Sequence, residues 1–287
     1  MTIEPVYTDY EQTTEETIEI DPVRKLNWKS KPNKQYWEEL LMSFDRVYTE
    51  MKFRAVGDDD HPRRAALDTI PSDEAIDVAT DASRRGLRFR EIMSGGDATT
   101  VVIAETADIA DEIEEISGAA TPEDRLELFP HFGVPEEAVE TAREFAEREI
   151  NSPIYELACR TPSAEHGEDG HEVIVRNPHP ILNVIWGYMG WRFVDFFPPH
   201  FEHDASREVA IANGRVLREL GYDEEAEALF EMLKAPMLWS GYNGIGHVKN
   251  PHCIGAYDLK DERWEEKRVI WRREHESLAE PETTPPA

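Results

Sequence analysis

The feature that most constrains how this chain can fold is a pair of amphipathic segments separated by one glycine. Residues 205–220 and 222–234 carry apolar side chains at helical spacing, and Gly221 lies between them. A glycine just past one helix and acidic residues in the first turn of the next are typical boundary signals. We therefore predict an αα-hairpin. It is similar to one tetratricopeptide-like unit, but the chain holds no second copy, which argues against a solenoid of stacked repeats.

Apolar periodicity or start signals predict further helices. The clearest is residues 36–51, where apolar side chains recur at steps of three and four. Pro135, followed by two acidic residues, is typical of a helix start. In chain order these further predicted helices are residues 36–51, 72–86, 107–117, 135–150 and 261–276.

The most apolar stretch of the chain is residues 181–197, interrupted by Asn183, Arg192 and Asp195. It falls short of the roughly 20 apolar residues that a membrane-spanning helix needs. We interpret it as a buried core helix and predict no membrane span.

Strands are predicted where β-branched residues gather between turn signals. Residues 98–104 read Ala-Thr-Thr-Val-Val-Ile-Ala, residues 171–176 form a second run, and a pair of short strands follows the glycine-rich residues 241–246. These patterns predict a helix-rich α+β fold with a small N-terminal β/α part and a C-terminal helical part. The predicted regions are a disordered acidic tail at 1–22, an N-terminal α/β region at 23–120, a C-terminal region with the candidate site at 121–276, and a disordered tail at 277–287.

The charge of the chain is strongly unbalanced, because 60 Asp and Glu face 31 Lys and Arg, giving a formal net charge of −29. In molar salt the Debye length falls to about 3 Å, which screens the repulsion between surface carboxylates. The imbalance favours a halophilic, archaeon-like source. No basic stripe or zinc-finger spacing is present, which argues against nucleic acid as a partner. The N-terminus lacks a signal-peptide pattern, so we expect a cytoplasmic protein.

Histidines gather in the C-terminal region and carry the main functional signal. His200 and His203 lie three residues apart at a predicted helix start with Glu202 between them, so that both imidazoles can reach one ion. A second group of ligand-forming side chains lies at residues 247–253. If the fold joins the two groups, imidazoles with a thiolate or carboxylate suit zinc or non-haem iron. The candidate metal site is therefore His200, His203, His247, His252, Cys253 and Glu202.

Other interpretations of these patterns stay open. Histidines before a helix often cap it or pack on aromatic rings, and a His-x-x-His pair without a third local ligand matches zinc sites weakly. The chain has two cysteines, so neither a disulfide framework nor an all-cysteine metal site is predicted. The Gly-x-x-Gly-x-Gly run at residues 241–246 follows a predicted helix rather than a strand, which argues against a nucleotide cofactor.

Several motifs, in their order along the chain, resemble an uncharacterised prokaryotic family. They span about residues 125–258 and are Gly133-Val134-Pro135-Glu136-Glu137-Ala138, Asn177-Pro178-His179-Pro180, residues 198–206, the hairpin and Pro236-Met237-Leu238-Trp239-Ser240. Members of that family carry Gly-Tyr-Pro-x-Cys-Cys at the first motif and Pro-Cys-Ser-x-x-Cys at residues 198–203. This chain has Glu137, Ala138, Pro199 and His203 in place of those cysteines. The resemblance implies a divergent member, without the iron–sulfur cluster that four such cysteines would permit.

Two functions follow from these patterns, with a small molecule or a protein as the unidentified partner. The first is a metal-binding protein or metal-dependent enzyme with a His/carboxylate site, in which a bound ion activates water or polarises a substrate oxygen. The alternative is a non-catalytic subunit or adaptor that uses the hairpin in a larger assembly. An exposed apolar groove beside the hairpin would favour the adaptor.

Overall fold

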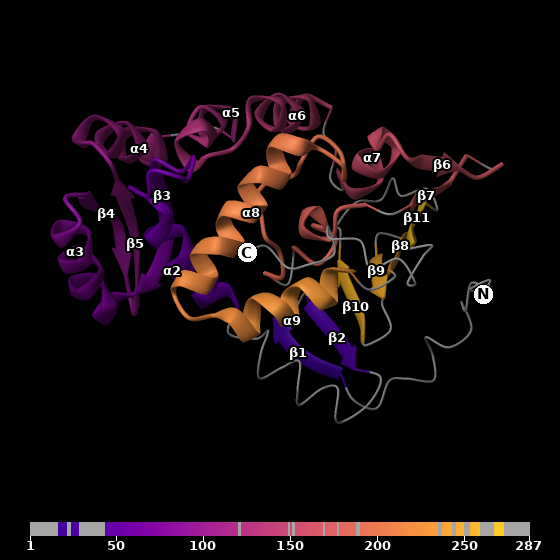
Figure 1. Ribbon diagram of the computed structural model, residues 1–287, viewed down its shortest axis with the longest axis horizontal. Coiled ribbons are helices and arrows are strands. Elements are labelled where there is room, and N and C mark those ends of the chain that lie inside the picture. Colours follow the sequence, from indigo (N-terminus) through magenta and orange to yellow (C-terminus); the bar gives the residue numbers. More distant parts are fainter. Residues whose placement is uncertain are drawn as a thin grey trace.

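The computed structural model describes residues 17–21, 24–28, 44–119, 122–148, 150, 153–168, 170–176, 178–187, 190–234, 237–242, 245–249, 253–258 and 267–272. Within these ranges, the backbone alone is described for residues 17–28, 118–119, 122–123, 237–258, 267–268 and 272. Within this part the fold is α+β and helix-rich, as the sequence predicts. Figure 1 shows two sheets at opposite sides of the molecule, with helix α8 (Asp204–Glu219) between them.

The N-terminal sheet is small and antiparallel, in the order β3, β5, β4. The sequence predicts the central strand β5 and the helices α3 and α4, but not the edge strands β3 and β4. Of the predicted helix 36–51, the described part is helical and continues to Ala55. The elements are α2 (Phe44–Ala55), β3 (Ala65–Pro71), η1 (Ser72–Glu74), α3 (Ala75–Arg84), β4 (Arg88–Gly95), β5 (Ala98–Ala104) and α4 (Ala107–Ala119).

Both faces of β5 are buried, which explains its run of β-branched residues. Val101 and Ile103 pack in one cluster with residues of α2 and α3, whereas Val102 packs in another with residues of α4. Successive side chains of a strand point to opposite faces, so β5 supplies apolar side chains to both layers. The sheet is therefore enclosed between helices on its two faces.

A run of short helices leads from the N-terminal sheet to the C-terminal part, across the upper edge of the molecule in Figure 1. The predicted helix at 135–150 is confirmed as α6, which follows Pro135. The elements of the run are α5 (Pro122–Leu126), η2 (Phe129–Phe132), α6 (Glu136–Glu147) and α7 (Pro153–Arg160).

The second sheet is mixed and joins strands from distant parts of the sequence, in the order β1-β2-β10-β9-β8-β11-β7-β6. Its neighbours are antiparallel except β11 and β7, which are parallel. The strands are β1 (Thr17–Asp21), β2 (Arg24–Trp28), β6 (Ala164–His166), β7 (Glu172–Arg176), β8 (Met237–Tyr242), β9 (Ile245–Lys249), β10 (Cys253–Asp258) and β11 (Lys267–Arg272).

The predicted αα-hairpin is confirmed as α8 and α9 (Asp223–Lys234). Gly221 adopts φ +87°, a conformation that glycine reaches without strain, and it follows the end of α8. The inner faces of both helices are buried in the largest core cluster. On α8, Ile211 is 38% exposed. One exposed apolar residue is not a groove, so the adaptor hypothesis stays a prediction.

The prediction of a core helix at residues 181–197 is wrong. Pro180–Leu182 form a 3₁₀ turn, η3, and the described residues after it are irregular, although most of their apolar side chains are buried. Asn183 Oδ1 accepts the amide hydrogen of Ile185 at 3.1 Å, and its Nδ2 donates to the carbonyl oxygen of Leu233 at 2.8 Å. Such side-chain bonds to the backbone compete with a helix. The burial was therefore predicted correctly and the helix was not.

Two further predictions differ from the structure. Of the predicted helix at 261–276, residues 267–272 are strand β11, because Val269 and Trp271 alternate as buried side chains at the period of a strand. Of the predicted disordered tail at 1–22, Thr17–Asp21 form β1, which pairs with β2. The other residues of both predictions lie outside the described part. No helix among the described residues is both long and apolar enough to cross a membrane.

Candidate functional site

Two of the four histidines predicted as metal ligands, His200 and His203, lie in one tight turn, residues 200–203, that leads into α8. We call it the histidine turn. The rings of His200 and His203 approach edge to face, with centroids 5.6 Å apart. Phe201 between them is fully buried, and its ring packs on Trp271 of β11 with centroids 5.0 Å apart. The turn is therefore anchored on the second sheet, and the structure brings His200 and His203 together.

Hydrogen bonds within the turn engage Nδ1 of both imidazoles, and Nδ1 of His203 also lies 2.9 Å from the hydroxyl oxygen of Ser206. Nδ1 of His200 accepts the amide hydrogen of Glu202 at 3.2 Å. Nδ1 of His203, the N-cap of α8, accepts the amide hydrogen of Ser206 at 3.3 Å. A neutral imidazole whose Nδ1 accepts carries its proton on Nε2. Burial, together with the neighbouring His203, lowers the pKa of His200, which favours this neutral form.

The carboxylate between the two histidines is engaged elsewhere. Glu202 accepts a hydrogen bond from the hydroxyl of Ser163. Among the residues that the structure describes, no three His, Cys, Asp or Glu side chains gather closely enough to hold a metal ion. The predicted ligand set is therefore incomplete within this part of the chain.

Two of the remaining predicted ligands, His247 and Cys253, belong to the far half of the second sheet. His247 lies in β9 opposite Ser240 of β8, and Cys253 begins β10. His252 lies outside the described residues. β8 separates β9 from β11, so two strand spacings, about 10 Å, lie between β9 and the strand that the histidine turn contacts. Whether these residues complete a site with His200 and His203 stays a prediction.

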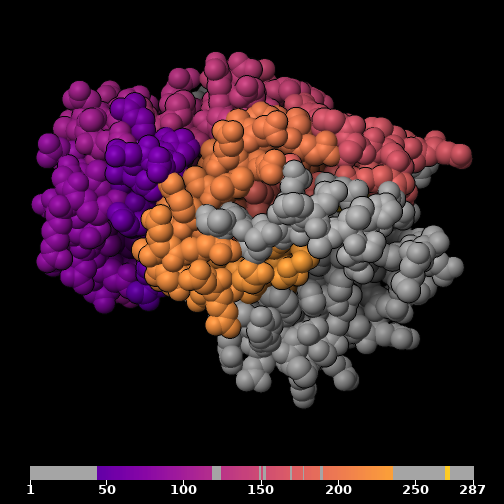
Figure 2. Space-filling view, in the orientation of Figure 1, coloured from indigo at the N-terminus to yellow at the C-terminus, as the bar shows by residue number. Residues whose placement is uncertain are grey.

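A pocket of about 450 Å³ lies where α2 and β3 meet the irregular segment after η3. This volume is within the usual range of small-molecule sites. Figure 2 shows the indigo and purple N-terminal part packed beside the orange hairpin. We call the pocket the seam pocket. It is lined by Asp45, Arg46, Tyr48, Thr49, Glu50, Lys52, Phe53, Asp68, Thr69, Ile70, Pro71, Glu74, Val78 and Arg192.

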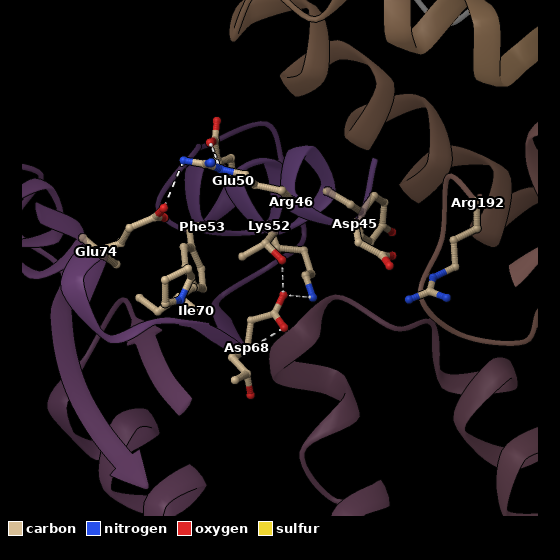
Figure 3. A pocket seen from close by; sticks show the side chains of 14 residues that line it. Asp45, Arg46, Glu50, Lys52, Phe53, Asp68, Ile70, Glu74 and Arg192 are labelled. Atoms are coloured by element: carbon tan, nitrogen blue, oxygen red, sulfur yellow. Dashed lines mark hydrogen bonds and ion pairs between the residues drawn. The ribbon is translucent and has the colours of Figure 1, made fainter. Parts of the chain in front are cut away.

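An ion pair between α2 and β3 forms one wall of the seam pocket. Nζ of Lys52 lies 2.5 Å from Oδ2 of Asp68, and the Lys52 side chain is 12% exposed. The hydroxyl of Thr49 donates to the same Oδ2 at 2.6 Å (Figure 3). Thr49 and Lys52 are three residues apart, so one face of α2 presents both to the strand.

Arg192 reaches the pocket from the other side. Its Nη1 donates to the carbonyl oxygen of Gly187 at 2.5 Å, and its guanidinium lies 5.7 Å from the ring centroid of Tyr48. Nζ of Lys52 lies at the same distance from that centroid. Gly190 adopts φ +81°, a conformation that other residues rarely adopt, and a Cβ there would overlap the carboxylate of Asp45 on α2.

An ion pair lies behind the pocket, in which Arg63 is buried and the side chain of Asp195 is 20% exposed. Arg63 is 1% exposed, and its Nη2 lies 3.2 Å from both carboxylate oxygens of Asp195. Burial alone would raise the pKa of Asp195, but Arg63, Lys52 and Arg192 together hold that pKa below its ordinary value. Burial and the Asp195 charge raise the pKa of Tyr48 well above 10.0. Asp195 therefore stays ionised and Tyr48 stays neutral near pH 7.

The segment that carries Arg63 is also held to α8, by a hydrogen bond between His61 and Asn213. Nδ1 of His61 accepts the amide hydrogen of Arg63 at 3.1 Å, so its Nε2 donates to Oδ1 of Asn213 at 2.9 Å. Nδ2 of Asn213 then donates to the carbonyl oxygen of Phe193 at 2.7 Å. Burial lowers the pKa of His61 to about 4, although the bond with Asn213 acts in the opposite direction. This chain of bonds joins the N-terminal part to the segment that bears Arg192.

The seam pocket was not predicted from the sequence, although part of its signal was visible. Arg192 and Asp195 interrupt the most apolar stretch of the chain. A charged residue inside a buried segment needs a partner, which makes it a candidate for a site. Lys52 and Asp68 gave no such signal, because each lies in a segment of ordinary polar and apolar alternation.

Comparisons of this chain with models of protein families, with curated proteins and with solved structures found no match in any of the three. The resemblance to a family with paired cysteines therefore stays a prediction.

Proposed function

We propose that this protein binds a small polar molecule in the seam pocket. The observation that carries the proposal is the placement of two cations from distant segments, Lys52 and Arg192, each 5.7 Å from the centre of the Tyr48 ring in the lining of one pocket. Bringing charged side chains out of water is unfavourable unless they are paired or serve a ligand. A pocket with a few convergent polar groups is a common form of binding site.

The pKa directions support binding rather than proton transfer. A general acid or base works best with a pKa near the working pH. The pKa of Asp195 is lowered and that of Tyr48 is raised, so both move away from neutrality. The pKa of His61, about 4, is also far from 7. These groups hold fixed charges and dipoles, which orient a ligand.

The test is a screen of small acids, amines, sugars and amino acids by the shift of the thermal unfolding midpoint, followed by calorimetry. Thr49→Trp should fill the pocket, because Thr49 lines it and its hydroxyl faces Asp68. Thr100→Trp is the control, because Thr100 does not line the pocket. Thr100 lies beside Thr69 on the face of the sheet opposite Asp68. Ligand binding that survives Thr49→Trp would place the site elsewhere.

We propose metal binding at the histidine turn as a second function, with zinc or non-haem iron as the ion. It is favoured by the 5.6 Å approach of the His200 and His203 rings. Coordination through Nε2 would require the proton of each ring to move from Nε2 to Nδ1, the nitrogen from which ligating histidines usually donate. Here Nδ1 accepts instead, so metal binding would have to break a cap of α8.

Elemental analysis of untagged protein purified without chelator tests this second function. His203→Asn keeps an N-cap side chain but removes the imidazole. Near-stoichiometric metal in the wild type that disappears in His203→Asn would support the metal site. Metal content that is absent from the wild type, or equal in both proteins, would rule out coordination by His203.

A further inference from the structure

We propose that the ligand of the seam pocket is a small organic anion and that Arg192 binds its carboxylate or phosphate group. This inference rests on the proposed function, since it names the chemistry of the molecule that the pocket takes. It makes Arg192 the residue that determines specificity.

Arg192 is distinguished from the other cations of the pocket by its partners. Arg46 pairs with Glu50 and Glu74, and Lys52 pairs with Asp68. The ion pairs among the described residues do not include Arg192, which lies across the pocket from the Lys52 pair in Figure 3. Its charge is therefore the one that the described carboxylates leave without a direct ion pair.

The guanidinium of Arg192 also has an N–H group without an acceptor among the described residues. Its Nη1 donates to the carbonyl oxygen of Gly187, while its Nε is buried and makes no hydrogen bond to a described residue. A guanidinium engaged at Nη1 still has the edge formed by Nε and Nη2. That edge matches two oxygens of a carboxylate or phosphate, and such bidentate bonds are among the strongest in proteins. Because Arg192 lines the pocket, we expect a bound anion to engage this edge as the guanidinium reorients.

The charge around Arg192 is set by how the other charged groups are paired. The lining holds four carboxylates, Asp45, Glu50, Asp68 and Glu74, and three cations, Arg46, Lys52 and Arg192, so the pocket as a whole is not positive. Lys52 pairs with Asp68 and Arg46 pairs with Glu50 and Glu74. An anion is therefore favoured at Arg192 and disfavoured in the rest of the lining.

The experiment measures binding to the full chain by calorimetry and by tryptophan fluorescence, for which Trp191 next to Arg192 is a buried reporter. The probes are acetate, glycolate, inorganic phosphate and glycerol 3-phosphate, with acetamide and glycerol as neutral counterparts. Chloride is kept low because it competes for the same cation. Comparing the carboxylate and phosphate probes identifies which group the pocket prefers.

Arg192→Ala should weaken anion binding by at least about 10-fold, the size expected for lost charge-assisted hydrogen bonds. Arg192→Lys keeps the positive charge but lacks the planar pair of N–H donors, so its affinity for the anion should lie between those of the wild type and Arg192→Ala. It serves as the test if Arg192→Ala does not fold. Arg46→Ala removes a cation from the same lining, but one that is 69% exposed and already paired. It should change the dissociation constant by less than about twofold.

Four outcomes would overturn the inference. Anion binding that survives Arg192→Ala but not Thr49→Trp would leave the pocket as the site and remove Arg192 from it. Equal binding of acetamide and acetate would show that charge is not recognised. If anions do not bind the wild type but neutral or cationic molecules do, the proposed function stands and the anion inference fails. If no molecule of either screen binds, both fail.

Discussion

The histidine turn and the seam pocket differ in where their partners lie. In the turn, His200 and His203 accept amide hydrogens from residues two and three positions further along the chain. In the seam, the charges come from α2, from the segment before β3, from β3 and from the segment after η3. Local needs of the backbone explain the first arrangement. They do not explain the charges of the seam, which come from distant segments. Binding of a ligand would explain why these charges are brought together.

The largest expected effect tests whether the seam is a buried charge cluster. Arg63→Met should destabilise the fold by about 3–5 kcal/mol, because it leaves the Asp195 carboxylate without its principal buried partner. Urea unfolding at pH 7 measures this loss. The double variant with Asp195→Asn should recover part of it. A loss below about 1 kcal/mol in Arg63→Met would mean that the cluster is effectively solvated.

The next effect concerns pH. His61 has an ordinary pKa of 6.5 that folding lowers to about 4, so the unfolded chain binds the proton more tightly. Its contribution is fully present above pH 6.5 and is lost as the pH falls towards 4. With about 1.4 kcal/mol for each pKa unit, the loss approaches about 3 kcal/mol.

Unfolding free energies between pH 7 and pH 4 measure this dependence. The pKa of His200 is also lowered, so His61→Asn and His200→Asn are compared. The slope should flatten more in His61→Asn. Equal slopes in His61→Asn and the wild type would show that the buried bond to Asn213 does not control protonation. The lowered pKa of Asp195 acts in the same direction at lower pH, below its ordinary 3.8.

A smaller effect is expected at the histidine turn. His203→Ala removes the N-cap of α8 and should cost about 1 kcal/mol, whereas His203→Asn should cost less because asparagine also caps helices. Thermal unfolding of metal-free protein measures both. Equal losses of stability in the two variants would mean that the imidazole does more than cap the helix. The histidine turn would then depend on contacts beyond its own backbone, as the seam pocket does.

The smallest effect is expected for the exposed rim of the pocket. Arg46→Ala breaks the pairs with Glu50 and Glu74, and such exposed pairs contribute between about 0.2 and 1 kcal/mol. The loss should shrink further as salt is added, because the pairs are screened. A loss as large as that of Arg63→Met would remove the distinction between rim and buried cluster.

The sequence predicted elements whose information is local. The hairpin, β5 and α6 follow from periodicity and from start and stop residues, and each is found close to its predicted bounds. The edge strands β3 and β4 and the order of the second sheet depend on pairing between distant segments. The helix predicted at 181–197 failed because one side chain, Asn183, redirects the backbone. Apolar content identified burial there, but not conformation.

The candidate site also has a part that local sequence patterns predicted and a part that they did not. The sequence identified His200 and His203 because they are neighbours, and the structure explains their proximity by bonds within the turn. Arg192 and Asp195 were visible only as interruptions of an apolar stretch. Their partners Lys52 and Arg63 lie more than a hundred residues earlier, so no local pattern could connect them.

The place of β11 in the second sheet bears on the order in which the protein folds. β11 lies between β8 and β7 and touches both, although it comes late in the chain. During synthesis, β6 and β7 must wait for it before they join β8 to β10. The strands of the N-terminal sheet all lie within residues 65–104, so this sheet can form before synthesis of the chain is finished. Long-range pairing of this kind is slow, so we expect the second sheet to set the pace of folding.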